Sequence, residues 1–341
     1  MTASPPADAG SGHVVAASFP EPKLAPARPR GTTTARLADR LFRAVSVGSG
    51  VLIVALIAAI GVFLLWRAMP ALARDKENFF SYSGNWVTTN SSEMHFGIFN
   101  LLQVTLSVSL FALLLAMPVA LGIAIFLIQY APRRVAGLLA YLVDMLAAVP
   151  SVIYGVWGLY VLAPRLRGIA TWLNDHLGWL FLFATGNASV AGGGTVFTGG
   201  IVLAVMILPI ISAVTREVFI QTPQGQMEAA MALGATRWEV VKTTVLPFGR
   251  SGFISGAMLG LGRALGETLA LLIIMRGTQQ AFRWSLFDGG RTFATKIAAT
   301  ALEFNDEFKA GAYIAAGLVL FVLTFAVNAL ARAAVAKRAN Q

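Results

Sequence analysis

Six long runs of apolar residues dominate the chain and decide what it can fold into. A helix that crosses the hydrocarbon core of a bilayer needs about 20 apolar residues, because each residue advances the helix by about 1.5 Å. Only 12% of the 341 residues are charged, and the mean hydropathy is +0.71. A soluble domain carries about twice that share of charge. The sequence therefore predicts an all-α polytopic membrane protein and excludes an ordinary soluble enzyme or a disordered chain.

Charged or proline-containing connections separate the runs, which gives six expected transmembrane helices. They cover residues 44–69, 98–128, 135–162, 197–214, 253–275 and 312–331, within a transmembrane domain over 44–332. Residues 1–43 are rich in Pro, Ala, Ser and Gly and are expected to form a disordered basic tail, with a second tail over 333–341. The first run is longer than the apolar part of a signal peptide, so we expect the first helix to be retained.

The distribution of Lys and Arg indicates how the six spans are oriented. With both termini on one side, 15 of the 26 basic residues fall in the tails and loops on that side, against 10 in the three opposite loops. Because cytoplasmic segments carry an excess of basic residues, both termini are expected in the cytoplasm, at the inner or plasma membrane. The net charge of +10 then reflects orientation rather than binding to nucleic acid.

The connection between the fourth and fifth spans, residues 215–250, is too long and too helix-prone for a simple link. Gly234 follows a run of good helix formers and is placed to end that helix. Thr236 and Glu239 have the spacing of a capping box, which would begin a second short helix that Pro247 is expected to end. The sequence predicts a helix–Gly–helix element, which is either a solvated hairpin or a docking surface for a cytoplasmic partner.

One arginine lies at a depth where lipid disfavours charge. Arg263 is ten residues into the fifth span, about 15 Å along the helix and near the middle of a ~30 Å core. Glu267 follows one turn later, so we expect it on the same face. The two residues either form an ion pair that only locks the helix, or Arg263 meets a hydrated anion while Glu267 holds it in place. Small residues that permit either close helix packing or rearrangement here are Gly260, Gly262 and Gly266.

Polar residues also interrupt the third span. Ser151 and Tyr154 offer hydroxyl groups to an anion, and ordinary helix packing is the equally weighted alternative. Pro150 is expected to loosen the helix and to free a backbone carbonyl. Asp144 either reaches the membrane surface or pairs with a basic residue of another span.

Residue types at fixed spacing in the fourth-to-fifth connection resemble the EAA loop of ABC importer permeases. The residues that carry this match are Glu228, Ala229, Ala230, Gly234, Leu246 and Pro247. Two further stretches, 149–158 (VPSVIYGVWG) and 259–268 (LGLGRALGET), are similar to motifs of the C permease subunits of phosphate-specific (Pst) ABC importers. The similarity extends over about residues 44–332.

This resemblance implies a type I ABC importer permease fold, in which the EAA loop carries a coupling helix seated on an ATPase subunit. It also implies a non-catalytic subunit that imports inorganic phosphate by alternating access. Arg263, Glu267, Ser151 and Tyr154 are the expected substrate-pathway residues. The implied partners are a second homologous permease, two ATPase subunits and an extracytoplasmic phosphate-binding protein, within the lipid bilayer and without nucleic acid.

The sequence lacks a Gly-x4-Gly-Lys-Ser/Thr phosphate loop, so ATP and Mg²⁺ are expected on the partner ATPase and no cofactor on this chain. It contains no Cys and only three widely separated His, so no metal site is expected. The open alternatives are a permease for another oxyanion such as sulfate or molybdate, an ion-gradient-driven secondary anion transporter, and a membrane sensor of phosphate.

Overall fold

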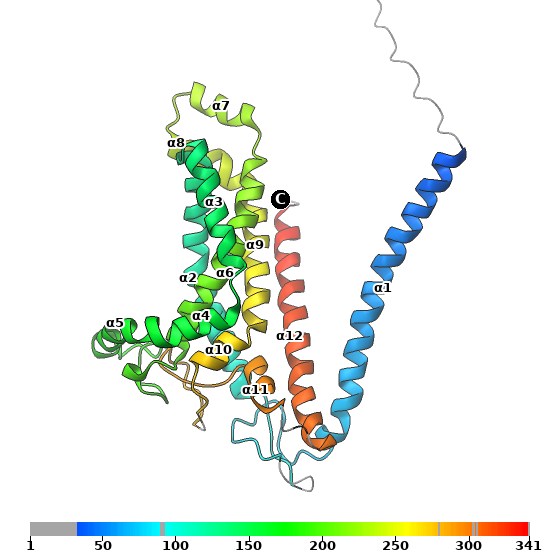
Figure 1. Ribbon diagram of the computed structural model, residues 1–341, viewed down its shortest axis with the longest axis vertical. Coiled ribbons are helices and arrows are strands. Elements are labelled where there is room, and N and C mark those ends of the chain that lie inside the picture. Colours follow the sequence, from blue (N-terminus) through cyan, green and yellow to red (C-terminus); the bar gives the residue numbers. More distant parts are fainter. Residues whose placement is uncertain (1–32, 89–92, 279, 302–303, 305, 340–341) are drawn as a thin grey trace, which may run out of the picture. The chain divides into compact units, whose positions relative to one another are not determined.

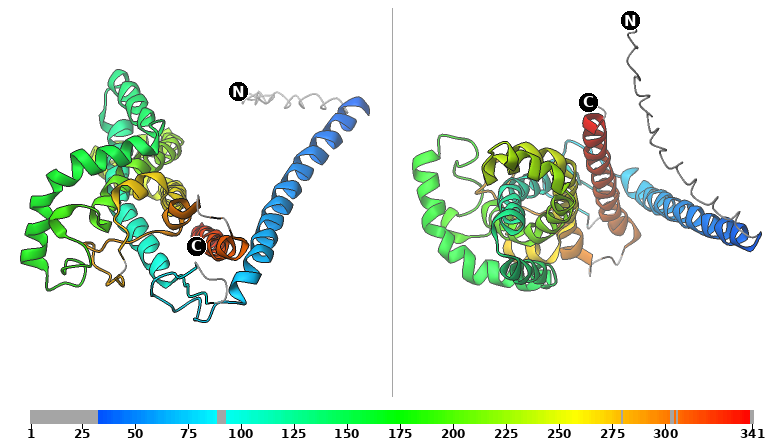
Figure 2. Two further views of the ribbon diagram at one scale, coloured as in Figure 1. Left: turned by 60° about the horizontal axis from the view of Figure 1, so that its bottom comes forward. Right: turned by 90° about the horizontal axis from the view of Figure 1, so that it is seen from above.

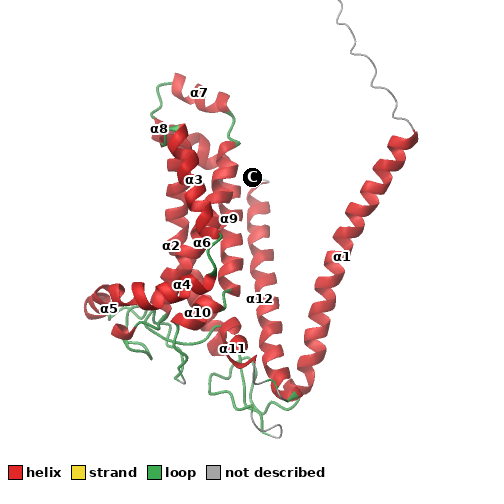
Figure 3. Cartoon of the chain, viewed as in Figure 1, coloured by secondary structure: helices red, strands yellow, loops and turns green. Residues whose placement is uncertain are grey.

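The computed structural model describes residues 33–88, 93–278, 280–301, 304 and 306–339. Helices dominate these residues, and no strand forms among them (Figure 3). The chain divides into two compact units, Met1–Ile57 and Ala58–Gln341. The described part of the first unit is the beginning of one apolar helix, α1 (Thr33–Leu72).

The second unit contains the rest of α1 and all later elements (Figure 1). The later α-helices are α2 (Phe99–Ile125), α3 (Arg133–Ala147), α4 (Ser151–Trp157), α5 (Ala163–Leu177), α6 (Val196–Ile220), α7 (Gln224–Ala232), α8 (Arg237–Val240), α9 (Leu246–Gly266), α10 (Leu269–Ile274), α11 (Phe293–Thr300) and α12 (Glu307–Ala339). The short segments are the π-helices η1 (Phe126–Tyr130), η2 (Gly158–Leu162) and η4 (Val241–Val245), and the 3₁₀-helix η3 (Val190–Gly192).

Four helical stretches among the described residues are long and apolar enough to cross a membrane. They are Asp39–Leu72, Phe99–Tyr130, Val190–Ile220 and Glu307–Leu330. These stretches overlap the first, second, fourth and sixth predicted spans, so the all-α polytopic class is confirmed. Six continuous spans are not confirmed, because the described residues contain four candidate spans, or five if one bent helix pair is counted as a span.

Helix α1 begins at Thr33, inside the segment that the sequence predicts to be a disordered tail. Residues 33–43 are therefore helical, and the remainder of that tail, residues 1–32, lies outside the described residues. The stretch 35–43 consists mainly of Ala, Leu and Arg, which have high helix propensity. Once the apolar span has formed, extending it through such residues adds one hydrogen bond per residue without a new nucleation step.

The third predicted span, residues 135–162, is not one straight helix. Helix α3 and the stretch Ser151–Leu177 meet at an angle of 90° (Figure 1). Pro150 has no amide hydrogen, and its ring disfavours a helical conformation at Val149, so the helix cannot continue. The break confirms the expected loosening at Pro150 and goes further, because α4 and α5 turn away from the direction of α3.

The fifth predicted span, residues 253–275, is also broken. Helix α9 ends at Gly266, and α10 begins at Leu269. Between them, Glu267 is extended, with φ −67° and ψ 127°. The sequence signals for this break were Gly266, which can end a helix, and Thr268, which can begin one before the apolar run 269–274.

Helical structure is continuous from α8 through η4 into α9, so the expectation that Pro247 ends a helix is wrong. Pro247 lies in the first turn of α9. The segment before it is a π-helix, in which hydrogen bonds join residues five apart. This wider spacing lets the helix continue although Pro247 has no backbone N–H to donate.

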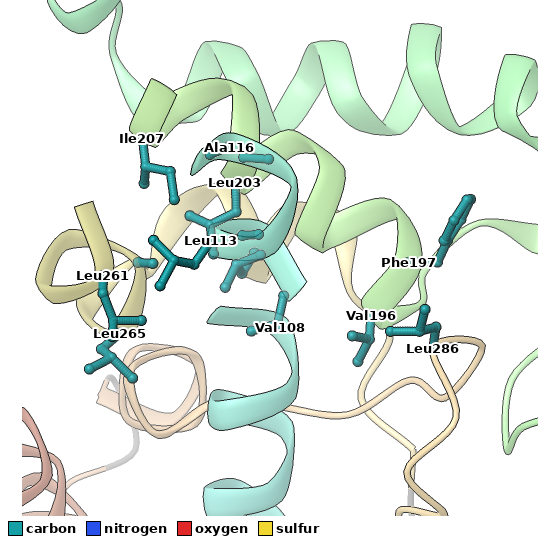
Figure 4. Close-up of a cluster of buried hydrophobic side chains, with 14 of the residues drawn as sticks. Val108, Leu113, Ala116, Val196, Phe197, Leu203, Ile207, Leu261, Leu265 and Leu286 are labelled. Carbon is teal, nitrogen blue, oxygen red and sulfur yellow. The ribbon is translucent and has the colours of Figure 1, made fainter. Parts of the chain in front are cut away.

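The core of the second unit forms where α2, α6 and α9 pack side by side (Figure 2). Val108, Leu203 and Leu261 come from these three helices, are all buried, and converge in Figure 4. Lipid tails are as apolar as these side chains, so burial from water does not hold such helices together. Close van der Waals contact does so instead.

Gly260 allows one of the close approaches of α9 to α6. A Cβ atom at this position would lie only 2.8 Å from Cγ1 of Ile211 on α6. Gly266, by contrast, has no atom within 4 Å of that position, and Gly262 only meets the side chain of Asn328 at 4.0 Å. Close packing therefore accounts for Gly260, but not for Gly262 or Gly266.

Candidate functional site

The break between α3 and α4 is held by Tyr154. Its side chain is buried, and its hydroxyl donates a hydrogen bond to the carbonyl oxygen of Leu146 at 2.8 Å. That carbonyl belongs to the last turn of α3, where a helix leaves acceptors without intrahelical partners. Pro150 cannot donate to this carbonyl, as predicted, and the carbonyl accepts from Tyr154 and, at 3.3 Å, from the backbone N–H of Val149. Ser151 begins α4 and is half-buried.

The break between α9 and α10 is held by Glu267. Its side chain is only 7% exposed, and its Oε1 accepts a hydrogen bond from the backbone N–H of Ala270 at 3.2 Å. The hydroxyl of Thr268 donates to the carbonyl of Gly266 at 3.1 Å. Both bonds serve backbone groups that lose their helical partners where the chain is interrupted.

The two breaks are neighbours, because α4 packs against α10. A Cβ atom at Gly155 would lie 3.0 Å from Cα of Ala270. Tyr154, Ala270 and Ile274 share one buried cluster with residues of α6. The structure thus places the stretch 149–158 against α10, which directly follows the stretch 259–268.

Arg263 occupies the last turn of α9 and is exposed on this chain. Among the described residues it forms no ion pair with Glu267, so the ion pair that was one of the two alternatives for these residues is absent. The helix ends before Glu267, and the two side chains therefore do not share one helical face. Asn328 of α12, next to Gly262, is a nearby polar residue that the sequence analysis did not single out, although an Asn inside an apolar run was a signal.

Asp144 pairs with a basic residue of another helix, as one of the two predictions for it stated. Its Oδ2 lies 3.0 Å from an Nη atom of Arg216. The pair links α3 to α6 at the end of the unit that carries α7. Both side chains are partly exposed, so the pair sets the relative position of two helices more than it stabilises the fold.

The predicted helix–Gly–helix element is present between α6 and α9. Gly234 follows α7 with φ +87°, a conformation that favours glycine, as expected of a helix-ending residue. The capping box at α8 is also confirmed. The backbone N–H of Thr236 donates to Oε2 of Glu239 at 2.7 Å, and the backbone N–H of Glu239 donates to the Thr236 hydroxyl oxygen at 3.3 Å. Hydrogen bonds from the backbone and hydroxyl of Thr236 hold the pKa of Glu239 below its usual value.

Helix α7 has no buried residue and projects from the body of the unit (Figure 1). The element is anchored below it, where Val241 and Val245 of η4 pack with Phe219 in a small buried cluster. We call α7, the turn after it and α8 the projecting element, residues 224–240. Of the six residues that resemble the EAA loop, Glu228, Ala229, Gly234 and Pro247 are exposed, and Ala230 and Leu246 are half-buried.

Apolar side chains on the projecting element face solvent. Leu233 is 90% exposed, and Met231 and Trp238 are about half exposed. A group of large apolar side chains at a structured, capped turn is typical of a contact surface for another protein. The structure of this element therefore favours docking over a merely solvated hairpin.

Comparisons with known proteins agree with this geometry. A family model of the binding-protein-dependent transport system inner membrane component matches residues 116–340. A phosphate transport system permease protein PstC 2 from Mycobacterium tuberculosis is 56% identical over 306 residues, covering 90% of this chain and 94% of the relative. A phosphate transport system permease protein PstC from Mycobacterium leprae is 58% identical over 310 residues, covering 91% and 97%.

A solved structure shares the fold. The crystal structure of a bacterial ABC transporter involved in the import of the acidic polysaccharide alginate matches with a TM-score of 0.56 at 14% sequence identity. The match covers 89% of this chain and 99% of that chain. The broken helices and the projecting element thus lie in an ABC transporter permease fold. The chain belongs to the family of binding-protein-dependent transport system inner membrane components, in the PstC permease branch of the type I ABC importers.

Proposed function

We propose that this chain is the permease subunit of an ATP-driven importer that moves inorganic phosphate into the cytoplasm by alternating access. The observation that carries the proposal is the 56–58% identity, over about nine-tenths of the chain, to permeases named for phosphate transport. Two local features support it: an arginine beside paired helix breaks, and a projecting element suited to docking.

Arg263 is the proposed contact with phosphate on the pathway. The side chain is exposed on this chain in the last turn of α9, and a charge left against lipid would be costly. A second homologous permease therefore covers this face and encloses a hydrated path. The guanidinium stays charged and matches phosphate oxygens with two parallel hydrogen bonds.

Glu267, Tyr154 and Ser151 act around that contact in different ways. Interrupted helices supply backbone polar groups at membrane depth, and such breaks line substrate sites in transporters. Glu267 and Tyr154 fix the two breaks through their bonds to backbone groups, and so position Arg263. The half-buried hydroxyl of Ser151 offers phosphate an additional donor.

The projecting element is the proposed coupling contact with the ATPase. ATP and Mg²⁺ bind that partner, and this chain is not itself catalytic. The residues that define the coupling contact are Glu228, Ala229, Ala230, Gly234, Leu246 and Pro247. The continuous helical path from Arg237 to Gly266 spans about 45 Å and joins this contact to the break beside Arg263. Movement of the ATPases would therefore displace the break directly.

The complete importer would contain a second permease, two ATPase subunits and an extracytoplasmic phosphate-binding protein, with both termini of this chain in the cytoplasm. The test is uptake of labelled phosphate by the purified complex in proteoliposomes. We expect uptake that needs ATP, is inhibited by vanadate and is not displaced by excess sulfate or molybdate. Uptake driven by an ion gradient alone, or preference for sulfate or molybdate, would refute the proposal.

A further inference from the structure

A cavity of about 380 Å³ opens at the first turn of α2, at the opposite end of that helix from the projecting element. Its walls come from the loop that precedes α2, from the loop between α10 and α11, and from α11 itself (Figure 1). Since a water molecule occupies about 30 Å³ of liquid, the cavity has room for a small oxyanion with several waters.

The chemistry of the walls favours an anion. Arg291 and Lys296 both line the cavity, and none of its described lining residues is acidic. Arg291 forms no ion pair within the described part of the chain. The hydroxyl groups of Tyr82, Thr278 and Thr300 lie in the same walls, and each donates to a backbone carbonyl, so the two cations are the groups that favour an anion.

Hydrogen bonds and close packing fix the walls of the cavity. The loop that carries Arg291 is organised by the fully buried carboxylate of Asp288, which accepts backbone N–H bonds from Asn187, Arg283 and Ser285 at 2.8–3.0 Å. A Cβ atom at Gly277 would lie 2.6 Å from Nε of Arg291, so the guanidinium group of Arg291 packs against the backbone of Gly277.

A helix cap and an aromatic contact hold Lys296 in place. A capping box between Thr292 and Thr295 fixes the start of α11 one turn before it. Its ammonium lies 5.0 Å from the centroid of the Trp86 ring, and the indole N–H of Trp86 donates to the carbonyl of Gly97 at 2.8 Å. Both cations thus have fixed neighbours on opposite loops of the cavity.

We propose that this cavity is an oxyanion site that holds inorganic phosphate at the outer face, before the ion reaches Arg263. The inference rests on the proposed phosphate-import function and adds a second contact to it. The two cations attract the ion, while the roomy and hydrated volume keeps the hold weak enough for onward movement. A phospholipid headgroup offers the same phosphate chemistry, so the test separates the two sources.

The test measures chemical labelling of Lys296 by an amine-reactive reagent in the purified complex, read by mass spectrometry. Nanodiscs of zwitterionic lipid hold the complex, and inorganic phosphate is compared with chloride at equal ionic strength. We expect phosphate to slow labelling of Lys296 but not of Lys76, an exposed lysine outside the cavity. In Arg291→Gln the phosphate concentration needed for protection should rise by roughly tenfold, since one charged hydrogen-bonding partner is lost.

Arg283→Gln is the matched control, because it removes the same charge from an exposed position on the same loop, outside the cavity. It should leave protection unchanged. Absence of protection by phosphate in a wild-type complex that transports phosphate would overturn this inference alone. Protection only by anionic phospholipid, in the absence of inorganic phosphate, would overturn it too. Failure of the wild-type complex to transport phosphate would instead refute the proposed function.

Discussion

Substitution of Gly234 by Ala tests whether the turn of the projecting element must adopt its observed shape. Gly234 has φ +87°, and no atom lies within 4 Å of the position of an added Cβ atom. The substitution therefore introduces no clash, and its cost is the backbone strain of a left-handed residue, about 1–2 kcal/mol. That cost lowers the population of the docking-competent turn roughly 5- to 30-fold relative to its alternatives.

Gly225→Ala provides the matched control. Gly225 lies in α7, has no neighbour within 4 Å and has no positive φ. Alanine is favoured over glycine inside a helix by up to about 1 kcal/mol, so this change should preserve or strengthen the element.

The assay is co-purification of the ATPase with the permease, together with hydrogen exchange of the backbone amides of residues 224–240. We expect weaker retention and faster exchange in Gly234→Ala, and wild-type behaviour in Gly225→Ala. Gly234→Asn should be intermediate, because asparagine tolerates the left-handed conformation better than alanine. Indistinguishable behaviour of the two alanine variants would refute the claim that this turn sets the docking geometry.

Three further perturbations address the breaks, the helix packing and the cap. Tyr154→Phe removes one of two donors to the Leu146 carbonyl, which keeps the backbone N–H of Val149, and should lower stability by about 0.5–1.5 kcal/mol. The exposed Tyr160→Phe should not change the Tm in detergent, and equal Tm values for the two variants would contradict this role of Tyr154. Gly260→Ala forces a contact with Ile211 and should destabilise by about 1–3 kcal/mol, while Gly266→Ala, with open space around it, should not; similar denaturation curves would refute the packing argument. The pKa of Glu239 is lower than its ordinary value of 4.5. The cap therefore stabilises the element at pH values above 4.5, and this stabilisation is lost as the pH falls through the lowered pKa. Hydrogen exchange of residues 236–240 should therefore be slower in wild type than in Glu239→Gln at pH 6, and the difference should vanish in acid; a difference that persists in acid would count against the cap.

Much of the architecture follows from local sequence signals. Apolar runs of sufficient length predicted the membrane class, and four of them are long continuous helices. The Thr236–Glu239 capping box and the helix-ending Gly234 depend only on residues close in sequence, and both were predicted correctly. The pairing of Asp144 with a basic residue of another helix was anticipated as one of two options, because a carboxylate at that depth needs a partner.

The remaining features depend on contacts between distant segments. Hydropathy alone could not distinguish a continuous fifth span from α9 and α10, because both sides of the break are apolar. The same limit applies to Glu267: helical spacing placed it beside Arg263, whereas the break directs it to the amide of Ala270. Pro247 was misjudged because a π-segment before it absorbs the missing hydrogen bond. The outer cavity brings residues near 82, 100 and 291 together, which no local pattern reveals.

Phosphate uptake and ATP hydrolysis, measured together in proteoliposomes that contain Arg263→Gln, test the central claim most directly. We predict that uptake falls by roughly 10- to 100-fold, the effect expected when hydrogen bonds from a charged donor are lost. The ATPase should still co-purify and hydrolyse ATP, because Arg263 lies about 35 Å along the helix from the end of the projecting element. Wild-type uptake by this variant would contradict a role for Arg263 on the phosphate pathway.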